Sequence, residues 1–254
     1  MSVSKDAWRS YLSGECGDEL ERLAAAYPDE RSLYVDLLDV HSFDEGFLQA
    51  LFEDPAAGFA AGEAVLEEIL DVSDPVHLRV ENNPQQRSVD GIRAYHVGDL
   101  VTVSGVVESV GPPRASAVSA AYECPVCAAS VTLEGAGIEM ETPTRCDNCG
   151  WDGDFPFRTG DSQFVDLQEI VLATESDDAG WITSLPAYLD DDIVGTASEG
   201  DHTKVTGIVR VHREGPTNEF TLYLDALAVQ GERQVAETET LDGVLDSHWG
   251  LTGE

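Results

Sequence analysis

Four cysteines arranged in two close pairs constrain the fold of this chain more than any other feature. The pairs are "CPVC", Cys124 to Cys127, and "CDNC", Cys146 to Cys149, with eighteen residues between them. Two such pairs can supply four thiolates to one tetrahedral ion, and the intervening length suits the two strands of a ribbon. Disulfides are rare in reducing compartments, where pairs at this spacing are typical of metal sites. The pattern predicts a structural Zn²⁺ held by Cys124, Cys127, Cys146 and Cys149, with two redox-active dithiol pairs as the alternative.

The remaining sequence changes character near residue 74. Before it, "DELERLAAAY" and "GEAVLEEILDV" carry apolar residues at helical spacing, whereas "SLYVDLLDV" fits either a strand or a buried helix. After it, runs such as "VHLRVEN", "DLVTVSGVVESV" and "HTKVTGIVRVHRE" are rich in β-branched residues and separated by Gly and Pro. Gly105 and Gly207 lie inside such runs, which indicates bends or close backbone approach. We expect a five-stranded barrel.

These patterns predict an α+β fold, in which an N-terminal helical domain is followed by an oligonucleotide-binding (OB) β-barrel with an inserted zinc ribbon. A small barrel without a ligand is the alternative. The expected divisions are residues 1–73 for the helical domain, 74–123 plus 159–230 for the OB-fold, 124–158 for the ribbon, and 231–254 for an acidic tail or linker.

The charge balance is extreme. The chain has 254 residues, with 49 Asp and Glu against 14 Lys and Arg, a formal net charge of −35. Such a charge strains a compact fold through self-repulsion in dilute salt, and this strain is largely screened in molar salt. We therefore expect a halophilic, archaeal type of protein. An ordinary acidic protein that repels nucleic acid is the alternative reading.

Several function classes lack their motifs in this sequence. It has no G-x-x-x-x-G-K-[ST] loop, no G-x-S-x-G elbow and no H-x-x-x-H pair, so no catalytic constellation is expected. It has neither a run of about 20 apolar residues nor the basic start and apolar core of a signal peptide. We expect a non-enzymatic cytoplasmic protein without a membrane partner.

The order of features resembles the N-terminal region of the minichromosome maintenance (MCM) replicative helicases. The resemblance is carried by "SLYVDLLDVHSFD", "VHLRVENNP", "IRAYHVGDLVTVSGVVESV", the four-cysteine ribbon, "FVDLQEI" and "EGDHTKVTGIVRV". It implies a helical A domain, an OB-fold B domain, a hexameric ring around DNA, and zinc ribbons that support stacking of rings. Family members carry an ATPase module beyond this region, and this sequence ends at Glu254. The chain is expected to be the amino-terminal region of a helicase or a standalone paralogue without that module.

DNA contacts are expected from basic side chains on the barrel and its loops: Arg114, Arg158, Lys204, Arg210, His212 and Arg213. Tyr122, Phe155 and Phe164 are candidates for stacking on bases, because OB barrels combine aromatic rings with a basic track. For each arginine the alternative role is a surface salt bridge.

The function expected from these features is a non-catalytic, DNA-binding and ring-forming protein of DNA replication. The barrel would bind single-stranded or double-stranded DNA, and the partners would be further copies of the chain and the MCM helicase. Two alternatives are an assembly or regulatory module that does not bind DNA, and a zinc-ribbon factor of transcription or translation.

Overall fold

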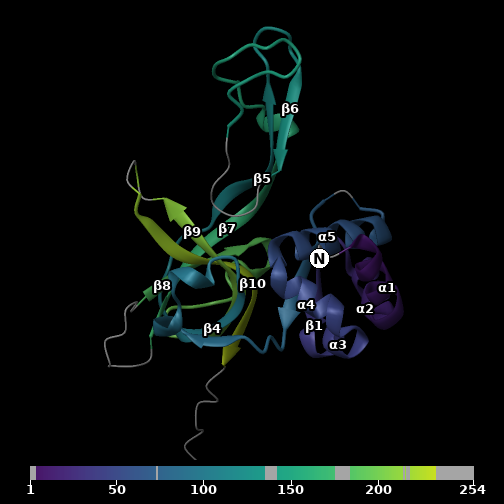
Figure 1. Ribbon diagram of the computed structural model, residues 1–254, viewed down its shortest axis with the longest axis vertical. Coiled ribbons are helices and arrows are strands. Elements are labelled where there is room, and N and C mark those ends of the chain that lie inside the picture. Colours follow the sequence, from purple (N-terminus) through teal and green to yellow (C-terminus); the bar gives the residue numbers. More distant parts are fainter. Residues whose placement is uncertain are drawn as a thin grey trace, which may run out of the picture.

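A helical module, a β-barrel and a projecting arm make up the computed structural model (Figure 1). The structure describes residues 4–72, 74–134, 142–174, 184–213, 215 and 218–232. The tail predicted over 231–254 lies almost wholly outside these residues, and the predicted division of the chain into domains stays a prediction. Among the described residues, no helix combines the length and the apolar character needed to cross a membrane.

The helical module contains five helices and two short strands. They are α1 Lys5–Glu15, α2 Gly17–Ala26, β1 Ser32–Asp36, α3 Leu37–Phe43, α4 Glu45–Glu53, α5 Pro55–Leu70 and β2 His77–Glu81. Aspartates explain why three of the helices begin where they do: the side chains of Asp36, Asp44 and Asp54 accept backbone N–H groups at the starts of α3, α4 and α5. Trp8 is fully buried and its indole N–H donates to the Gly58 carbonyl at 2.7 Å, which fixes α1 against α5.

One predicted strand belongs to a different sheet from the one expected. "VHLRVEN" was expected to be a barrel strand, but β2 pairs in parallel with β1, and its apolar residues Val76, Leu78 and Val80 pack in the core of the helical module. The prediction was wrong because a short β-branched run does not reveal its partner strand. "SLYVDLLDV" proves to be both of its alternatives, since its first half is β1 and its second half begins α3.

The barrel is closed by five strands: β4 Leu100–Val110, β7 Gln163–Ala173, β8 Ser184–Asp190, β9 His202–Arg213 and β10 Phe220–Glu232. β4 pairs antiparallel with both β7 and β9, β7 with β8, and β9 with β10, while β8 and β10 are parallel. This strand pairing is that of an OB-fold. The expected α+β fold with an OB barrel is therefore confirmed. A short strand, β3 Gln86–Ser88, lies beside β4, with the 3-10 segments η1 Val89–Gly91 and η2 Ala94–His96 between them.

Gly105 and Gly207 confirm the expected close approach of backbones. A Cβ added to Gly105 would lie 2.7 Å from the Ala173 carbonyl oxygen, and one added to Gly207 would lie 2.5 Å from that of Asp225. Real Cβ atoms do not come this close, so any side chain at either position would force the neighbouring strand away.

The arm is inserted between β4 and β7. It is built on β5 Arg114–Glu123, which pairs with β7 over its first half and with β6 Ser130–Glu134 over its second half. The chain returns to the barrel through η3 Thr159–Asp161. Figure 1 shows β5 and β6 extending away from the barrel to a set of loops at the far end.

The helical module is held to the barrel by charged side chains. Three consecutive aspartates, Asp190–Asp192, end β8 and form the 3-10 segment η4 Asp191–Ile193. Arg79 of β2 is 1% exposed and binds the carboxylates of Asp190 and Asp192. Asp191 accepts from His77 at 2.9 Å and from Arg31 at 3.0 Å. We call this set, Arg31, His77, Arg79 and Asp190–Asp192, the charge cluster.

Candidate metal centre and nucleic-acid interface

The four cysteines of the two pairs meet at the far end of the arm. Their sulfur atoms all lie within 4.8 Å of one another. The Cys124 and Cys149 sulfurs are 3.7 Å apart, as are those of Cys127 and Cys146. Four sulfurs bound tetrahedrally at about 2.3 Å from one Zn²⁺ would be about 3.8 Å apart. The cluster therefore has the donors and the spacing to hold a metal ion.

Two matching turns bring the sulfurs together. The Ala128 N–H donates to the Cys124 carbonyl at 2.9 Å, and the Gly150 N–H donates to the Cys146 carbonyl at 2.8 Å. Ala128 and Gly150 both have positive φ, 57° and 72°. The Asn148 amide donates to the Cys127 sulfur at 3.4 Å and lowers the pKa of that thiol to about 6, which favours the thiolate that a metal needs.

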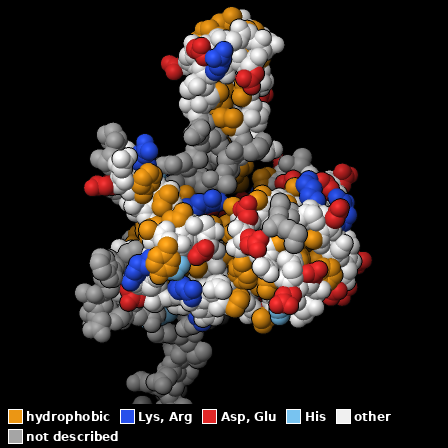
Figure 2. Space-filling model, in the orientation of Figure 1, with side chains coloured by type: hydrophobic (Ala, Val, Ile, Leu, Met, Phe, Trp, Pro, Cys, Tyr) orange, Lys and Arg blue, Asp and Glu red, His pale blue; other side chains and the backbone are white. Residues whose placement is uncertain are grey.

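Little apolar packing supports this end of the arm. Its buried cluster comprises Ala120, Tyr122, Cys124, Cys146 and Phe155, so two of its five buried members are the cysteines themselves. Figure 2 shows hydrophobic side chains along the arm and at its tip, where they face solvent. A core this small leaves much of the stability of the arm to a bound ion.

A row of polar and aromatic side chains crosses the outer face of the barrel. Its members, which we call the barrel row, are Arg114, Glu169, Tyr188, Tyr223, Arg210 and Asp225. Their neighbours along each strand, including Ile170, Leu189, Leu224 and Val209, are buried in the barrel core, so the row faces outward.

Adjacent members of the barrel row are in contact or in register. The Arg114 guanidinium lies 3.9 Å from the Glu169 carboxylate, and Glu169 is the register partner of Tyr188. The rings of Tyr188 and Tyr223 meet edge to face with centroids 5.2 Å apart. Burial and the Glu169 carboxylate raise the pKa of Tyr188 to about 12, so its hydroxyl stays protonated and can donate.

Arg210 and Asp225 form the other end of the barrel row. Arg210 is the register partner of Tyr223 and donates to the Asp225 carboxylate at 3.0 Å. Burial raises the pKa of Asp225, and the Arg210 guanidinium opposes that rise. In OB-folds, ligands bind across the second and third strands, between the loop that joins the first two strands and the loop that joins the last two. Here those strands are β7 and β8, and the barrel row crosses both.

The predicted DNA residues do not form one basic track. Arg114 is 60% exposed and lies at the base of the arm, whereas Arg210 shares an ion pair in which both side chains are about a quarter exposed. Arg158 lies farther along the arm, where its backbone N–H donates to the Ala121 carbonyl, and its side chain pairs with Glu123 at 3.2 Å and Asp161 at 3.9 Å. Lys204 lies on β9 at the end of the strand opposite to Arg213.

Arg210 and Arg213 face opposite ways. Successive residues of a strand point to alternate faces, so Arg210 and His212 share the outer face of β9 and Arg213 points to the other. Arg213 lies over the Phe220 ring, 5.5 Å from its centroid, at the base of the β9–β10 hairpin. Both arginines were expected to contact DNA, and the structure places them on opposite faces of β9.

Of the three aromatic candidates, only Phe164 is available for stacking. Tyr122 and Phe155 are each 8% exposed and pack inside the arm, while Phe164 is 43% exposed beside Phe157, with ring centroids 6.2 Å apart. Sequence reasoning missed Tyr188 and Tyr223. The period-two pattern of "LPAYLD" and "EFTLYLDA" could have placed both on the outer face, but it could not have paired their rings.

Comparison with known proteins agrees with this geometry. Residues 88–213 match the sequence model of the MCM OB domain. Just under half of the chain is therefore similar to the MCM OB domain. The chain is similar to the crystal structure of the N-terminal domain of an archaeal MCM, with a TM-score of 0.74 and 27% identity, over 89% of this chain and 97% of that one.

Relatives by sequence are MCM proteins of several organisms. The minichromosome maintenance protein MCM of Saccharolobus solfataricus is 25% identical over 229 residues, which is 82% of this chain and 33% of that protein. The probable DNA helicase MCM8 of Arabidopsis thaliana is 27% identical over 143 residues, 54% of this chain and 18% of that protein. The chain thus spans a third or less of the length of these relatives.

Proposed function

We propose that this chain is a non-catalytic module of DNA replication that binds single-stranded DNA on its MCM OB domain and assembles with further MCM subunits into a hexameric ring. The observation that carries this proposal is the barrel row, which puts two arginines and the partly exposed Tyr188 on the ligand-binding face of the OB-fold. Tyr223 is 5% exposed and supports the Tyr188 ring from the edge. The likeness to an archaeal MCM N-terminal domain supports the ring. The cytoplasmic location expected from the sequence stays a prediction.

The arm has a separate part in this proposal. Cys124, Cys127, Cys146 and Cys149 hold a structural Zn²⁺, and the arm that it stabilises stacks one ring on another. A bound Zn²⁺ supplies four bonds that fix the two turns, and with four thiolate ligands it leaves no open position for chemistry. The exposed hydrophobic tip, with Val126 64% exposed, supports a protein contact there.

Arg114 is the best probe of strand binding. It is exposed, and its contact with Glu169 is long, so replacing it should leave the fold intact. Arg114→Ala is expected to weaken binding of a labelled single strand and to flatten the slope of log affinity against log salt by about 0.7, the loss of one phosphate contact. Fluorescence anisotropy across a salt series measures both.

Arg9→Ala is the control, because Arg9 is also an exposed arginine that pairs with one glutamate, but on the helical module. Its salt slope should equal that of the unmodified chain. An Arg114→Ala slope that also stays unchanged would remove Arg114 from the interface. Arg210→Ala is a poorer probe, since it leaves the half-buried Asp225 carboxylate without its cation.

An assembly module that does not bind DNA is the second candidate. It is favoured by the ion pairs that engage Arg114, Arg158 and Arg210, since a phosphate would have to displace a carboxylate at each. If the unmodified chain forms rings but binds no single strand at any salt concentration in which it is soluble, this candidate holds.

We also propose adaptation to concentrated salt, from the net charge of −35 and the presence of only two lysines. Self-repulsion is screened over about 3 Å at molar salt and over about 10 Å at 0.1 M. The melting temperature should therefore fall as KCl is diluted from molar to about 0.1 M. Sucrose at equal osmolarity is the control, since it leaves charge unscreened. Equal melting temperatures in dilute and molar KCl would contradict the proposal.

A further inference from the structure

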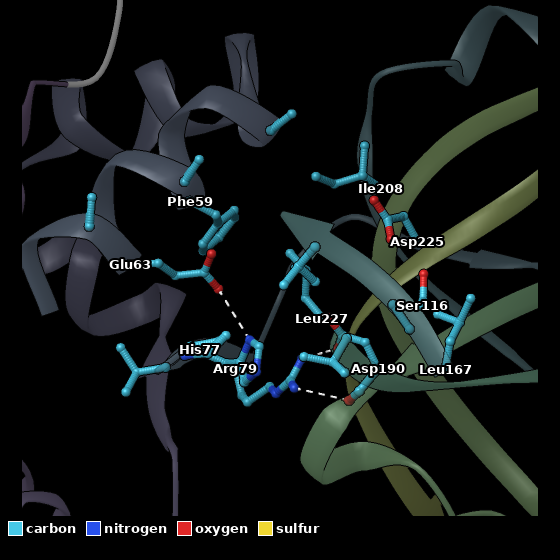
Figure 3. A pocket seen from close by; sticks show the side chains of 18 of the residues that line it. Phe59, Glu63, His77, Arg79, Ser116, Leu167, Asp190, Ile208, Asp225 and Leu227 are labelled. Carbon is cyan, nitrogen blue, oxygen red and sulfur yellow. Dashed lines mark hydrogen bonds and ion pairs between the residues drawn. The ribbon is translucent and has the colours of Figure 1, made fainter. Parts of the chain in front are cut away.

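A groove between the helical module and the barrel runs beside the barrel row, with lining residues from β5, β7, β8, β9 and β10. Its volume is about 550 Å³, within the range of about 300–1,000 Å³ typical of ligand sites. Figure 3 shows Phe59, Glu63, His77 and Arg79 on the helical side, and Ser116, Leu167, Ile208, Asp225 and Leu227 on the barrel side. Arg210 and Asp225 belong to both the groove and the barrel row, so a strand that crosses the row passes the groove.

The walls of the groove are apolar and its cations are already neutralised. Apolar side chains line both sides, with Phe59 on the helical side and Val165, Leu167, Ile208 and Leu227 on the barrel side. Leu167 and Leu227 are the most exposed of these, since Phe59 and Ile208 are 2% and 4% exposed. Arg79 is held by Asp190 and Asp192, and Arg210 by Asp225. Both of these arginines are already paired with carboxylates, so neither is free to bind a phosphate. The groove offers apolar surface and carboxylate oxygens, which suit a base better.

One carboxylate oxygen of Glu63 is available to accept a further hydrogen bond. One of its carboxylate oxygens accepts the Leu78 N–H at 3.2 Å and faces the His77 ring nitrogen at 3.8 Å. Its other oxygen has no hydrogen-bond partner among the residues that the structure describes. A carboxylate accepts well from the exocyclic amino group of cytosine, whereas thymine presents a carbonyl oxygen at the same position.

We propose that the groove takes one unstacked base from a single strand lying on the barrel row, and that Glu63 favours amino-bearing bases, cytosine above all, over thymine. The base would stack between the apolar walls while its phosphates stay outside near Arg114. This inference rests on the proposed strand binding at the same face, and it adds a base preference and a role for the helical module.

The test compares oligonucleotides of cytosine and of thymine, equal in length, by fluorescence anisotropy at one salt concentration and at about pH 8. Burial raises the pKa of Glu63 to about 7, so at this pH its carboxylate is mostly ionised and can accept. The unmodified chain should bind the cytosine strand about five- to tenfold more tightly. Glu63→Gln keeps the shape of the side chain but offers an amide, and should reduce this preference to less than twofold. Glu68→Gln is the matched control on the same helix, since Glu68 is turned toward Lys5 and Arg9 and should leave the preference unchanged.

A second variant tests the groove without touching Glu63. Ala60 is exposed on α5 and lines the groove, so Ala60→Trp should fill it without disturbing a core. It should weaken cytosine-strand binding to the level of the thymine strand. Equal affinity of the unmodified chain for both strands, or a preference that survives Glu63→Gln and Ala60→Trp, would overturn the inference while strand binding stands. Failure to bind either strand would overturn strand binding itself.

Discussion

Arg79→Ala is expected to be the most destabilising single substitution in the charge cluster, lowering the free energy of unfolding by about 3–5 kcal/mol. Arg79 is 1% exposed and binds two aspartates, Asp190 and Asp192. Its removal leaves both carboxylates at the junction of the helical module and the barrel without their main cation. Urea unfolding at one fixed high salt concentration measures the loss.

Two variants control this experiment. Arg9→Ala removes an exposed arginine from a surface pair with Glu68 and should cost less than about 1 kcal/mol. Arg79→Met combined with Asp190→Asn and Asp192→Asn removes the charges together and should be less damaging than Arg79→Ala alone. A loss below about 1 kcal/mol for Arg79→Ala would show that the helical module does not depend on this pair.

Cys146→Ser is expected to abolish metal binding and to unfold the arm while the barrel stays folded. Structural Zn²⁺ supplies about 10–16 kcal/mol of apparent binding free energy in small zinc-finger peptides, and the buried cluster of the arm is too small to replace it. Metal analysis should find one Zn²⁺ per chain before the substitution and none after it. Amide NMR signals should collapse toward unfolded positions for residues 119–134 and 142–158 alone.

Cys16→Ser is the matched control for the metal. Cys16 is the fifth cysteine, buried in the helical module away from the other four, and its loss should leave the zinc content at one per chain. Absence of zinc from unmodified protein with intact thiols would contradict the structural metal. A redox dithiol role would instead show as reversible loss of thiols on mild oxidation.

Local sequence patterns predicted the helices and strands of this fold better than the contacts between them. The cysteine spacing predicted the cluster, and the period-two runs predicted β4, β7, β9 and β10, because both signals depend on neighbours in sequence. Arg79 shows where such reasoning ends. In "VHLRVEN" it reads as the polar face of a half-exposed strand, but its partners lie more than one hundred residues away at Asp190 and Asp192.

The candidate interface was predictable only in part, for the same reason. Arg114 and Arg210 were both expected on the barrel. The sequence could not show that they lie at opposite ends of one row. That arrangement depends on the register of β5, β7, β8, β10 and β9, and on the ring contact of Tyr188 with Tyr223. The same register brings the Glu169 carboxylate next to Arg114 and the Asp225 carboxylate next to Arg210.

One strand, β5, belongs to both the barrel and the arm. Movement of the arm can therefore be transmitted to the barrel through this strand. It pairs with β7 up to Ser119 and with β6 from Ser119 onward, and its register shifts between Ala117 and Ser119, next to this change of partner. The five residues of β5 beyond the bulge span about 17 Å. A tilt of about 10° at the bulge would therefore carry the cysteine end of this strand about 3 Å sideways. Because β5 continues into the barrel, force applied at the cysteine end would reach the register that aligns Arg114 with Glu169. Contact between arm tips would then alter the proposed strand-binding face.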